Sequence, residues 1–329
     1  MATTSKIHST GIYVPEETMS NEEFEEITGR DLTGFAEYIG IDHRHLSTEE
    51  ETPAYMAAEA GLDALDNADM DVEDLDLIIV GTDTPEAVTP PTAIKTQDMM
   101  GGSEAEVPAF DVDASCANGS LMLDIASRFI KSGDFENVLV IGTYAMTKML
   151  NWKYQWEALF SDGAAAVLLS ETDGPGFVGA ESKSDGSWWN NWGIYMGTGT
   201  MDMDGINDGL HKLDQRAAFP SEINEEGWPN MIADLKEKYD FENEDIGKIF
   251  FTQVRKKSIE KVMDEMALPM EKTHMTMGKF GYTGSACVYQ ALHDARQNGE
   301  MENVESGQKV LFIMSGVGYT QWGTVFEWE

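Results

Sequence analysis

The chain has 329 residues, with 59 aspartates and glutamates against 22 lysines and arginines, and its formal net charge is −37. This balance excludes a nucleic-acid-binding protein built on a basic surface, because neutralising phosphates requires an excess of cationic side chains. The hydrophobic content of 42% and the 31 glycines are typical of a globular protein with a large core, and they exclude disorder driven by low hydrophobicity.

The acidic residues run through the whole chain, as in segments 22–26, 49–51 and 242–245, and do not form a tail. A dense carboxylate surface is typical of halophile proteins, because strong salt screens the repulsion between its charges. We therefore interpret this as a halophile-type protein. An ordinary acidic cytosolic protein is the alternative interpretation.

No charged and apolar leader occurs at residues 1–16, and no apolar run reaches 18 residues. We therefore expect a cytoplasmic protein without membrane insertion. The two cysteines, Cys116 and Cys287, make neither a disulfide framework nor a thiolate metal site. The spacing of histidines, cysteines and acidic residues predicts no metal site either.

The predicted elements alternate between helices and short buried strands. The first helix is expected over 53–67, and the last residues of the segment 73–80 form the first buried strand. Residues 160–163 form a turn before a buried strand over 164–169. Further helices are expected over 230–239 and 258–267, the second ending before Pro269.

The sequence indicates a duplication. Segment 73–80 matches 244–251, and segment 138–141 matches 310–313 at almost the same offset. Between them, each half has a small-residue turn leading into a helical pattern, at 114–132 and 283–298. We predict two related α/β halves, 1–172 and 173–329, with a tryptophan-rich insertion near 185–215 in the second. A chance resemblance of generic strands is the alternative.

Cys116 lies where a strand over 110–113 turns into a helix. At a helix N-terminus the macrodipole and free N–H groups favour a thiolate and its attack on a carbonyl, and they can stabilise an oxyanion. A small cysteine beside Ala and Ser is also common in a plain core. From this segment alone, nucleophile and core residue remain equally open, whereas Cys287 is typical of a helix core.

Five segments, in this order and spacing, resemble the thiolase superfamily and most closely its β-ketoacyl-acyl carrier protein synthase III branch. They are 40–45, 113–119, 160–166, 281–286 and the glycine-rich 315–323, and the resemblance extends from Ile7 to Trp328. It implies a thiolase-like α/β fold of two βαβαβαββ halves in five α-β-α-β-α layers. It also implies a homodimer, or a heteromer with a related synthase.

The resemblance implies that Cys116 is the acyl-accepting nucleophile. Its backbone N–H and that of Gly316 or Val317 would form the oxyanion hole. The substrate would be a coenzyme A thioester or an acyl carrier protein thioester, with no tightly bound cofactor. The catalytic histidine and asparagine of the family are replaced by Thr252 and Tyr282, which puts decarboxylative condensation in doubt.

Thr252 and Tyr282 each offer a hydroxyl donor, but neither is a good general base near pH 7. His211 and His274 are the histidines that could replace the lost base, although ordinary surface or edge-strand roles are favoured for both. Glu86 is a weaker candidate for a carboxylate base, near where relatives that condense two acyl thioesters without decarboxylation carry a glutamate.

Five basic residues gather within one short stretch of this acidic chain: Lys248, Arg255, Lys256, Lys257 and Lys261. The resemblance places this stretch beside the pantetheine channel, with Lys257 where a basic residue contacts a coenzyme A phosphate. A helix face paired to neighbouring acids is the alternative. Trp188, Trp189 and Trp192 are candidates for the wall of an acyl tunnel, although an interface or core role is favoured.

The leading hypothesis is an acyltransferase of the 3-oxoacyl-acyl carrier protein synthase III type that is acylated on Cys116 and passes the acyl group on. The loss of the histidine and asparagine leaves two alternatives. One is a non-catalytic or half-catalytic partner subunit of a ketosynthase or thiolase complex. The other is a non-decarboxylative condensing enzyme of the hydroxymethylglutaryl type that uses a carboxylate base.

Overall fold

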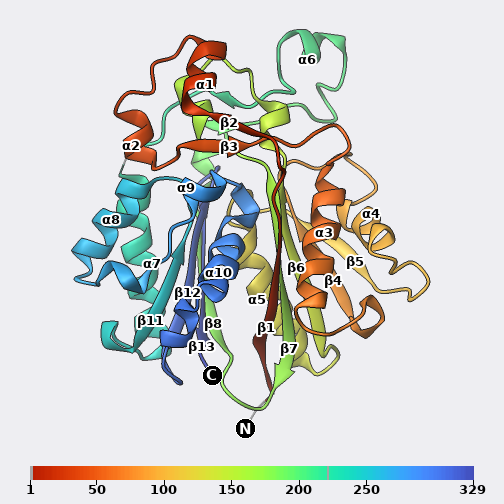
Figure 1. Ribbon diagram of the computed structural model, residues 1–329, viewed down its shortest axis with the longest axis vertical. Coiled ribbons are helices and arrows are strands. Elements are labelled where there is room, and N and C mark those ends of the chain that lie inside the picture. The colour runs from red at the N-terminus through yellow and green to blue at the C-terminus, as the bar shows by residue number, and fades with distance from the viewer. Residues whose placement is uncertain (1–2, 221) are drawn as a thin grey trace.

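The computed structural model describes residues 3–220 and 222–329 and contains two main β-sheets (Figure 1). The first sheet has the order β1-β7-β6-β4-β5, formed by Thr4–Tyr13, Gly163–Thr172, Asn137–Tyr144, Leu77–Gly81 and Ala109–Val112. The second has the order β8-β13-β12-β11, formed by Phe177–Ser184, Thr320–Glu327, Lys309–Gly316 and Ile246–Phe251.

The two sheets repeat one topology. In the first, β4, β5 and β6 are parallel while β1 and β7 run antiparallel to their neighbours. In the second, β11 and β12 are parallel while β13 and β8 are antiparallel. An isolated bridge between Ile249 and Thr273 takes the place of the fifth strand. The duplicated thiolase-like fold predicted from the sequence is therefore confirmed.

Helices and sheets form five layers (Figure 1). The central layer holds α5 (Asn118–Ser132) and α10 (Cys287–Gln297), between the two sheets. Helices α3 (Pro53–Asp66) and α4 (Thr92–Met99) cover the outer face of the first sheet. Helices α7 (Ile223–Tyr239) and α8 (Lys256–Glu265) cover the second. Because both faces of each sheet are covered, a strand such as β4 is buried at all five positions.

Short elements form a cap over one end of the sheets (Figure 1). They include β2 (Thr18–Ser20), β3 (His43–His45), α1 (Asn21–Thr28), α2 (Phe35–Ile39), β9 (Trp192–Gly193), α6 (Met203–Asn207), β10 (Asp214–Gln215) and α9 (Met277–Phe280). Single 3-10 turns lie at Val72–Asp74, Met146–Met149, Gln155–Leu159, Gly186–Trp188, Asn243–Asp245, Met270–Lys272, Gly284–Ala286 and Glu300–Asn303. The parallel strands of both sheets point their carboxyl ends toward this cap.

The predicted helices agree with the structure except at one boundary. The helix expected over 53–67 is α3, and that over 258–267 is α8, shifted by two residues. Helix α7 begins at Ile223, well before the predicted start at 230, and it contains Pro229. Complete burial of Trp228 against the second sheet keeps the preceding turns helical.

Close backbone packing joins the two halves around α5. A β-carbon on Gly142 of β6 would lie 2.4 Å from the carbonyl oxygen of Ser285, so only glycine allows this approach. On α5 itself, a β-carbon on Gly119 would lie 2.8 Å from the sulfur of Met314. The segment carrying Cys116 is therefore fixed against the second half of the chain.

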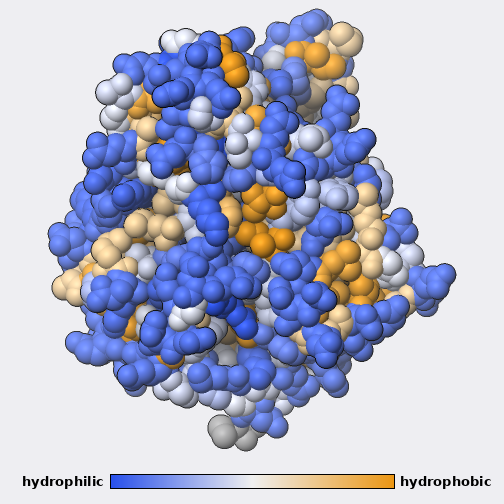
Figure 2. Space-filling view, viewed as in Figure 1, coloured by the Kyte–Doolittle hydropathy of each residue, from blue (hydrophilic) through white to orange (hydrophobic). Residues whose placement is uncertain are grey.

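The face shown in Figure 2 is largely hydrophilic, and hydrophobic patches interrupt it near the centre and over the α3–α4 region. Among the described residues, no helix is both long enough and apolar enough to cross a bilayer.

Candidate active site

A cavity of about 240 Å³ lies at the carboxyl ends of the parallel strands. In the first sheet, Asp83 follows β4, Cys116 follows β5 and Tyr144 ends β6. These strands are parallel neighbours in the order β6-β4-β5, so their ends deliver the three side chains to the same edge of the sheet.

The second sheet contributes in the same way. Thr252 follows β11, and Ser315 and Gly316 end β12, its parallel neighbour. Tyr282 comes from the loop before α10. The rest of the wall is mainly apolar: Phe35, Ile39, Met146, Trp156, Leu159, Phe160, Trp192, Leu213, Phe219, Pro220, Ile223, Val254 and Val317. The cavity is therefore formed by the ends of three strands of the first sheet, β4, β5 and β6, and of two strands of the second, β11 and β12.

A strained turn presents Cys116 to the cavity. Ser115 has a φ of 51°, and its N–H donates to the Asp113 carboxylate at 2.7 Å. The side-chain oxygen of Asn118, the first residue of α5, accepts from the Ala114 N–H at 2.5 Å. The thiol of Cys116 is left 6% exposed, as part of the cavity wall.

The glycine-rich segment 315–323 packs against this turn through Gly316. A β-carbon on Gly316 would lie 2.7 Å from the Ala114 carbonyl oxygen and 3.1 Å from the Cys116 nitrogen. Val317 follows in the wall of the same cavity. The structure therefore brings Cys116, Gly316 and Val317 together at one cavity wall, as the predicted oxyanion hole requires.

Burial raises the pKa of the Cys116 thiol well above its usual value, and the nearby Asp83 charge raises it further. Hydrogen bonds from the Tyr282 and Tyr144 hydroxyls oppose this rise. The sequence suggested a thiolate favoured by the helix N-terminus, but it could not show how deeply the sulfur is buried. Burial also raises the pKa of both tyrosines, so both keep their protons and remain donors.

Thr252 and Tyr282, which the resemblance places at the family's histidine and asparagine positions, both reach the cavity. Thr252 is 1% exposed, and its hydroxyl oxygen accepts from the Ser315 N–H at 2.9 Å. The ring of Tyr282 lies 6.2 Å from that of Tyr144. Asn224 of α7, which the sequence analysis did not single out, also lines the cavity and accepts from the Ser315 hydroxyl at 2.8 Å.

Asp83 carries the only carboxyl group among the described residues that line the cavity, and no histidine lines it there. Its Oδ1 is buried without a hydrogen-bond partner. Burial, followed by the charge of Asp113, raises the pKa of Asp83 to about 7. The sequence analysis considered Glu86 and missed Asp83. The available signal was its place directly after a predicted buried strand.

Comparison with known proteins supports this assignment of the fold. Residues 110–186 match the family model for 3-oxoacyl-[acyl-carrier-protein (ACP)] synthase III, and residues 237–328 match its C-terminal model. The β-ketoacyl-[acyl-carrier-protein] synthase III of Clostridium novyi is 30% identical, over 98% of this chain and 99% of its own. The chain belongs to the 3-oxoacyl-[acyl-carrier-protein] synthase III family.

The synthase III of Neisseria gonorrhoeae is 32% identical over 98% of both chains. The crystal structure of the synthase III from Aquifex aeolicus superposes with a TM-score of 0.87 at 28% identity, covering 98% of this chain and all of that one. Membership of this family makes the chain a transferase-type condensing enzyme.

The basic residues between 248 and 261 do not gather at one site in this synthase III member. Arg255 lines the cavity, and its Nη1 donates to the Tyr38 hydroxyl at 3.1 Å. Lys256 and Lys257 begin α8 outside the wall, and Lys257 pairs with Glu260 at 2.9 Å. Lys248 is buried and paired with Glu300 at 2.6 Å.

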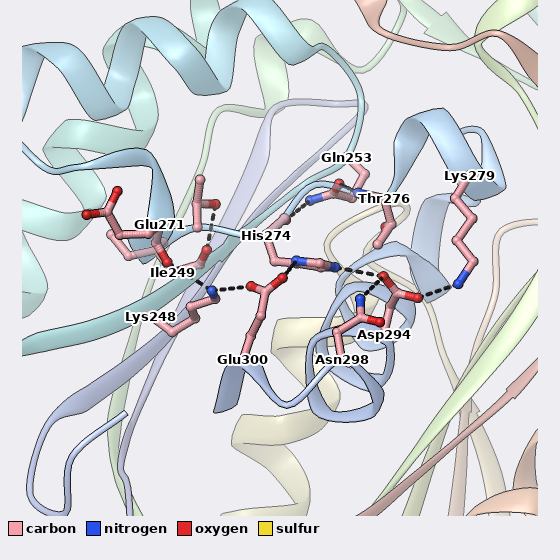
Figure 3. Close-up of polar contacts among 11 residues, drawn as sticks. Lys248, Ile249, Gln253, Glu271, His274, Thr276, Lys279, Asp294, Asn298 and Glu300 are labelled. Atoms are coloured by element: carbon pink, nitrogen blue, oxygen red, sulfur yellow. Dashed lines mark hydrogen bonds and ion pairs between the residues drawn. The ribbon is translucent and has the colours of Figure 1, made fainter. Parts of the chain in front are cut away.

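His274 belongs to a polar network outside the cavity (Figure 3). Its ring nitrogens lie 2.9 Å from Asp294 and 2.9 Å from Glu300. Lys279 and Lys248 bind the same two carboxylates, at 2.5 and 2.6 Å. His274 therefore has a structural role in this network. His211 does not line the cavity either. Neither histidine stands where the missing base would act.

The tryptophan-rich insertion reaches the cavity through Trp192, Leu213 and Gln215. Trp192 lines it, with its ring 5.2 Å from Trp156 and edge-on to it. Trp188 lies behind the wall and stacks on the lining residue Phe219 at 5.3 Å. Trp189 is 67% exposed. Of the three tryptophans singled out from the sequence, Trp192 lines the cavity, Trp188 contacts it through Phe219, and Trp189 does not line it.

Proposed function

We propose that this protein is an acyltransferase that takes an acyl group from an acyl thioester onto Cys116 and passes it to an acceptor. The observation that carries the proposal is the thiol in the wall of an apolar cavity, with the Gly316 backbone against its own amide. Acyl transfer through a thioester needs a nucleophile, backbone N–H groups that stabilise the oxyanion, and space for an acyl chain.

In the loading step the sulfur of Cys116 attacks the thioester carbonyl. The N–H groups of Cys116 and of the loop at Gly316 and Val317 stabilise the negative charge that develops on the carbonyl oxygen. The C–S bond to the donor breaks, and the thiol proton goes to the departing thiolate. The hydroxyls of Tyr282 and Tyr144 support the Cys116 sulfur while it carries charge.

Either coenzyme A or an acyl carrier protein is the proposed donor. Arg255 in the cavity wall offers a cationic group for the phosphates of either carrier, whereas Lys256 and Lys257 at the start of α8 are paired with Glu260 outside the wall. A homodimer is also proposed, since β5 is a four-residue edge strand with one side unpaired in this chain. A heteromer with a related synthase would use the same edge.

The proposed setting is a salt-rich cytoplasm. The charge of −37 supports it, because screening at about 1 M salt reduces repulsion among surface carboxylates. We expect the thermal midpoint of unfolding to rise by more than about 10 °C between 0.1 and 2 M KCl. A midpoint that stays constant or falls would contradict the halophile interpretation.

The proposal is tested by incubating the protein with hexanoyl-coenzyme A and measuring the intact mass. We expect an adduct of one acyl group that Cys116→Ala abolishes. Cys287→Ala is the matched control, because Cys287 is equally buried but lies in the core at the start of α10. No adduct with hexanoyl-coenzyme A, acetyl-coenzyme A or their carrier-protein equivalents would overturn the proposal.

A partner subunit of a heteromeric complex is the second candidate, supported by Thr252 and Tyr282 at the positions of the family's catalytic pair. Copurification with a histidine-containing homologue, with turnover only in the mixture, would favour it. A homogeneous preparation that turns over acyl thioesters by itself would exclude it.

A further inference from the structure

We propose that Asp83 is the general base of a condensation without decarboxylation, taking a proton from the α-carbon of an acyl-thioester acceptor. This inference rests on the proposed acylation of Cys116. It assigns the acceptor class, an acyl thioester with α-hydrogens and no malonyl carboxyl group, and it replaces the missing histidine and asparagine.

The position of Asp83 follows from strand order. It leaves β4, the strand between β5, which leads to Cys116, and β6, which ends at Tyr144. Asp83, Cys116, Tyr144 and Tyr282 all line the same cavity, and the charge of Asp83 raises the pKa of the other three side chains. An acceptor whose α-carbon faces the acyl group on Cys116 therefore lies beside this carboxyl group.

Neighbouring threonines hold Asp83 in place without neutralising it. The Thr84 N–H donates to the Thr82 hydroxyl at 3.0 Å, and the Thr84 hydroxyl accepts from the Ala145 N–H at 2.9 Å. Both threonines are buried, so the residue between them has a fixed backbone. These bonds fix the backbone that carries the carboxyl group and leave its Oδ1 without a hydrogen-bond partner.

The carboxyl group lacks the partners that a structural carboxylate would have. Buried carboxylates are normally paired or fully hydrogen-bonded, as Asp162 is by Ser47 and Thr147. The buried Oδ1 of Asp83 has no hydrogen-bond partner, although the residue lines the cavity. Burial raises its pKa to about 7, which suits a base near neutral pH.

The chemical step balances within the groups present. Asp83 takes the α-proton, and the electrons of that C–H bond form an enolate whose oxygen accepts a hydrogen bond in the polar part of the cavity. The α-carbon then bonds to the acyl carbonyl carbon, and the C–S bond to Cys116 breaks. The thiolate takes the proton from Asp83. The product is a 3-oxoacyl thioester, no CO₂ is released, and no oxidant or reductant is needed.

The high pKa of the Cys116 thiol fits the last step, because the released thiolate holds a proton more strongly than Asp83 does. A malonyl acceptor fits less well. Its carboxylate would enter a cavity that already contains the Asp83 charge and, among the described lining residues, no histidine or lysine; the cationic side chain there is Arg255, which donates to the Tyr38 hydroxyl.

The experiment separates proton removal from acylation. Acetyl-coenzyme A is incubated with the enzyme in D₂O, and deuterium entering its methyl group is measured by mass spectrometry. Asp83→Asn is expected to reduce this exchange at least about 100-fold, while hexanoyl-coenzyme A still forms the adduct on Cys116. Asp83→Glu is expected to recover part of the exchange. Glu86→Gln is the matched control outside the cavity and should exchange like the wild type.

In the full reaction, hexanoyl-enzyme and acetyl-coenzyme A are expected to give 3-oxooctanoyl-coenzyme A. Equal exchange in the wild type and Asp83→Asn, or product formed only from malonyl-coenzyme A with release of CO₂, would overturn the inference. Absence of the adduct on Cys116 would instead overturn the proposed function. The two failures are therefore distinguishable, because α-proton exchange needs no acylated enzyme.

Discussion

The backbone of Gly316 lies against the amide of Cys116, so closely that a β-carbon on Gly316 would stand 3.1 Å from the Cys116 nitrogen. Gly316 ends β12 in the second half of the chain, and Cys116 follows β5 in the first. The candidate oxyanion site is therefore built across the duplication, and it depends on one residue having no side chain.

Gly316→Ala is expected to slow acylation of Cys116 by about 100-fold, because the methyl group displaces one of the two backbone donors. The rate of adduct formation from hexanoyl-coenzyme A measures this. Gly199→Ala is the matched control, since a β-carbon there meets nothing within 4 Å. Similar acylation rates for Gly316→Ala and the control would place the oxyanion elsewhere.

Tyr282→Phe is expected to shift alkylation of Cys116 by iodoacetamide to higher pH. The Tyr282 hydroxyl hydrogen-bonds the sulfur and lowers the pKa of the thiol, so its loss raises that pKa and reduces the thiolate fraction at any given pH. The measurement is the pH profile of the alkylation rate.

Tyr289→Phe is the control for the tyrosine substitution. It removes another buried hydroxyl, bonded to the Gly119 carbonyl oxygen at 2.6 Å, from a residue that does not line the cavity. Its profile should match the wild type. A shift of equal size in both variants would show that lost stability, and not the missing hydrogen bond, moves the profile.

Asp83→Asn is expected to stabilise the fold increasingly as the pH rises from about 4 to 7. The pKa of Asp83 is about 7 in the folded protein, above its ordinary value of about 3.9 in the unfolded chain. Over this range the unfolded chain loses the proton first, so the wild type loses stability and the asparagine variant does not.

Thermal unfolding at pH 5 and pH 8 in constant high salt measures this difference. The midpoint of Asp83→Asn should exceed that of the wild type by more at pH 8. Asp173→Asn, at an exposed position, serves as the control. A difference between Asp83→Asn and the wild type that stays the same at both pH values would mean that the carboxyl group is not desolvated.

Arg255→Gln is expected to raise the KM for hexanoyl-coenzyme A by about tenfold, whereas Lys257→Gln should raise it less than about twofold. Arg255 lines the cavity, while Lys257 lies outside its wall and is paired with Glu260. Exposed ion pairs contribute little and are screened by salt. A larger effect at Lys257 would move the phosphate contact to the start of α8.

The sequence by itself was enough to predict the fold, and its resemblance to the family assigned the role of nucleophile to Cys116. Uninterrupted apolar runs such as 77–80, the turn at Cys116 and the glycine-rich segment containing Gly316 are local patterns, because strand burial and tight turns restrict residue type within a few positions. Their repetition along the chain also predicted the duplicated strand order.

The tertiary structure alone decided which polar side chains line the cavity together with Cys116. Asp83 and Glu86 are three residues apart, yet only Asp83 lines the cavity, because it directly follows the central parallel strand. Burial likewise decided that the pKa of the Cys116 thiol is raised and not lowered. Desolvation and proximity across two sheets depend on the packing of segments distant in sequence, and no local pattern records them.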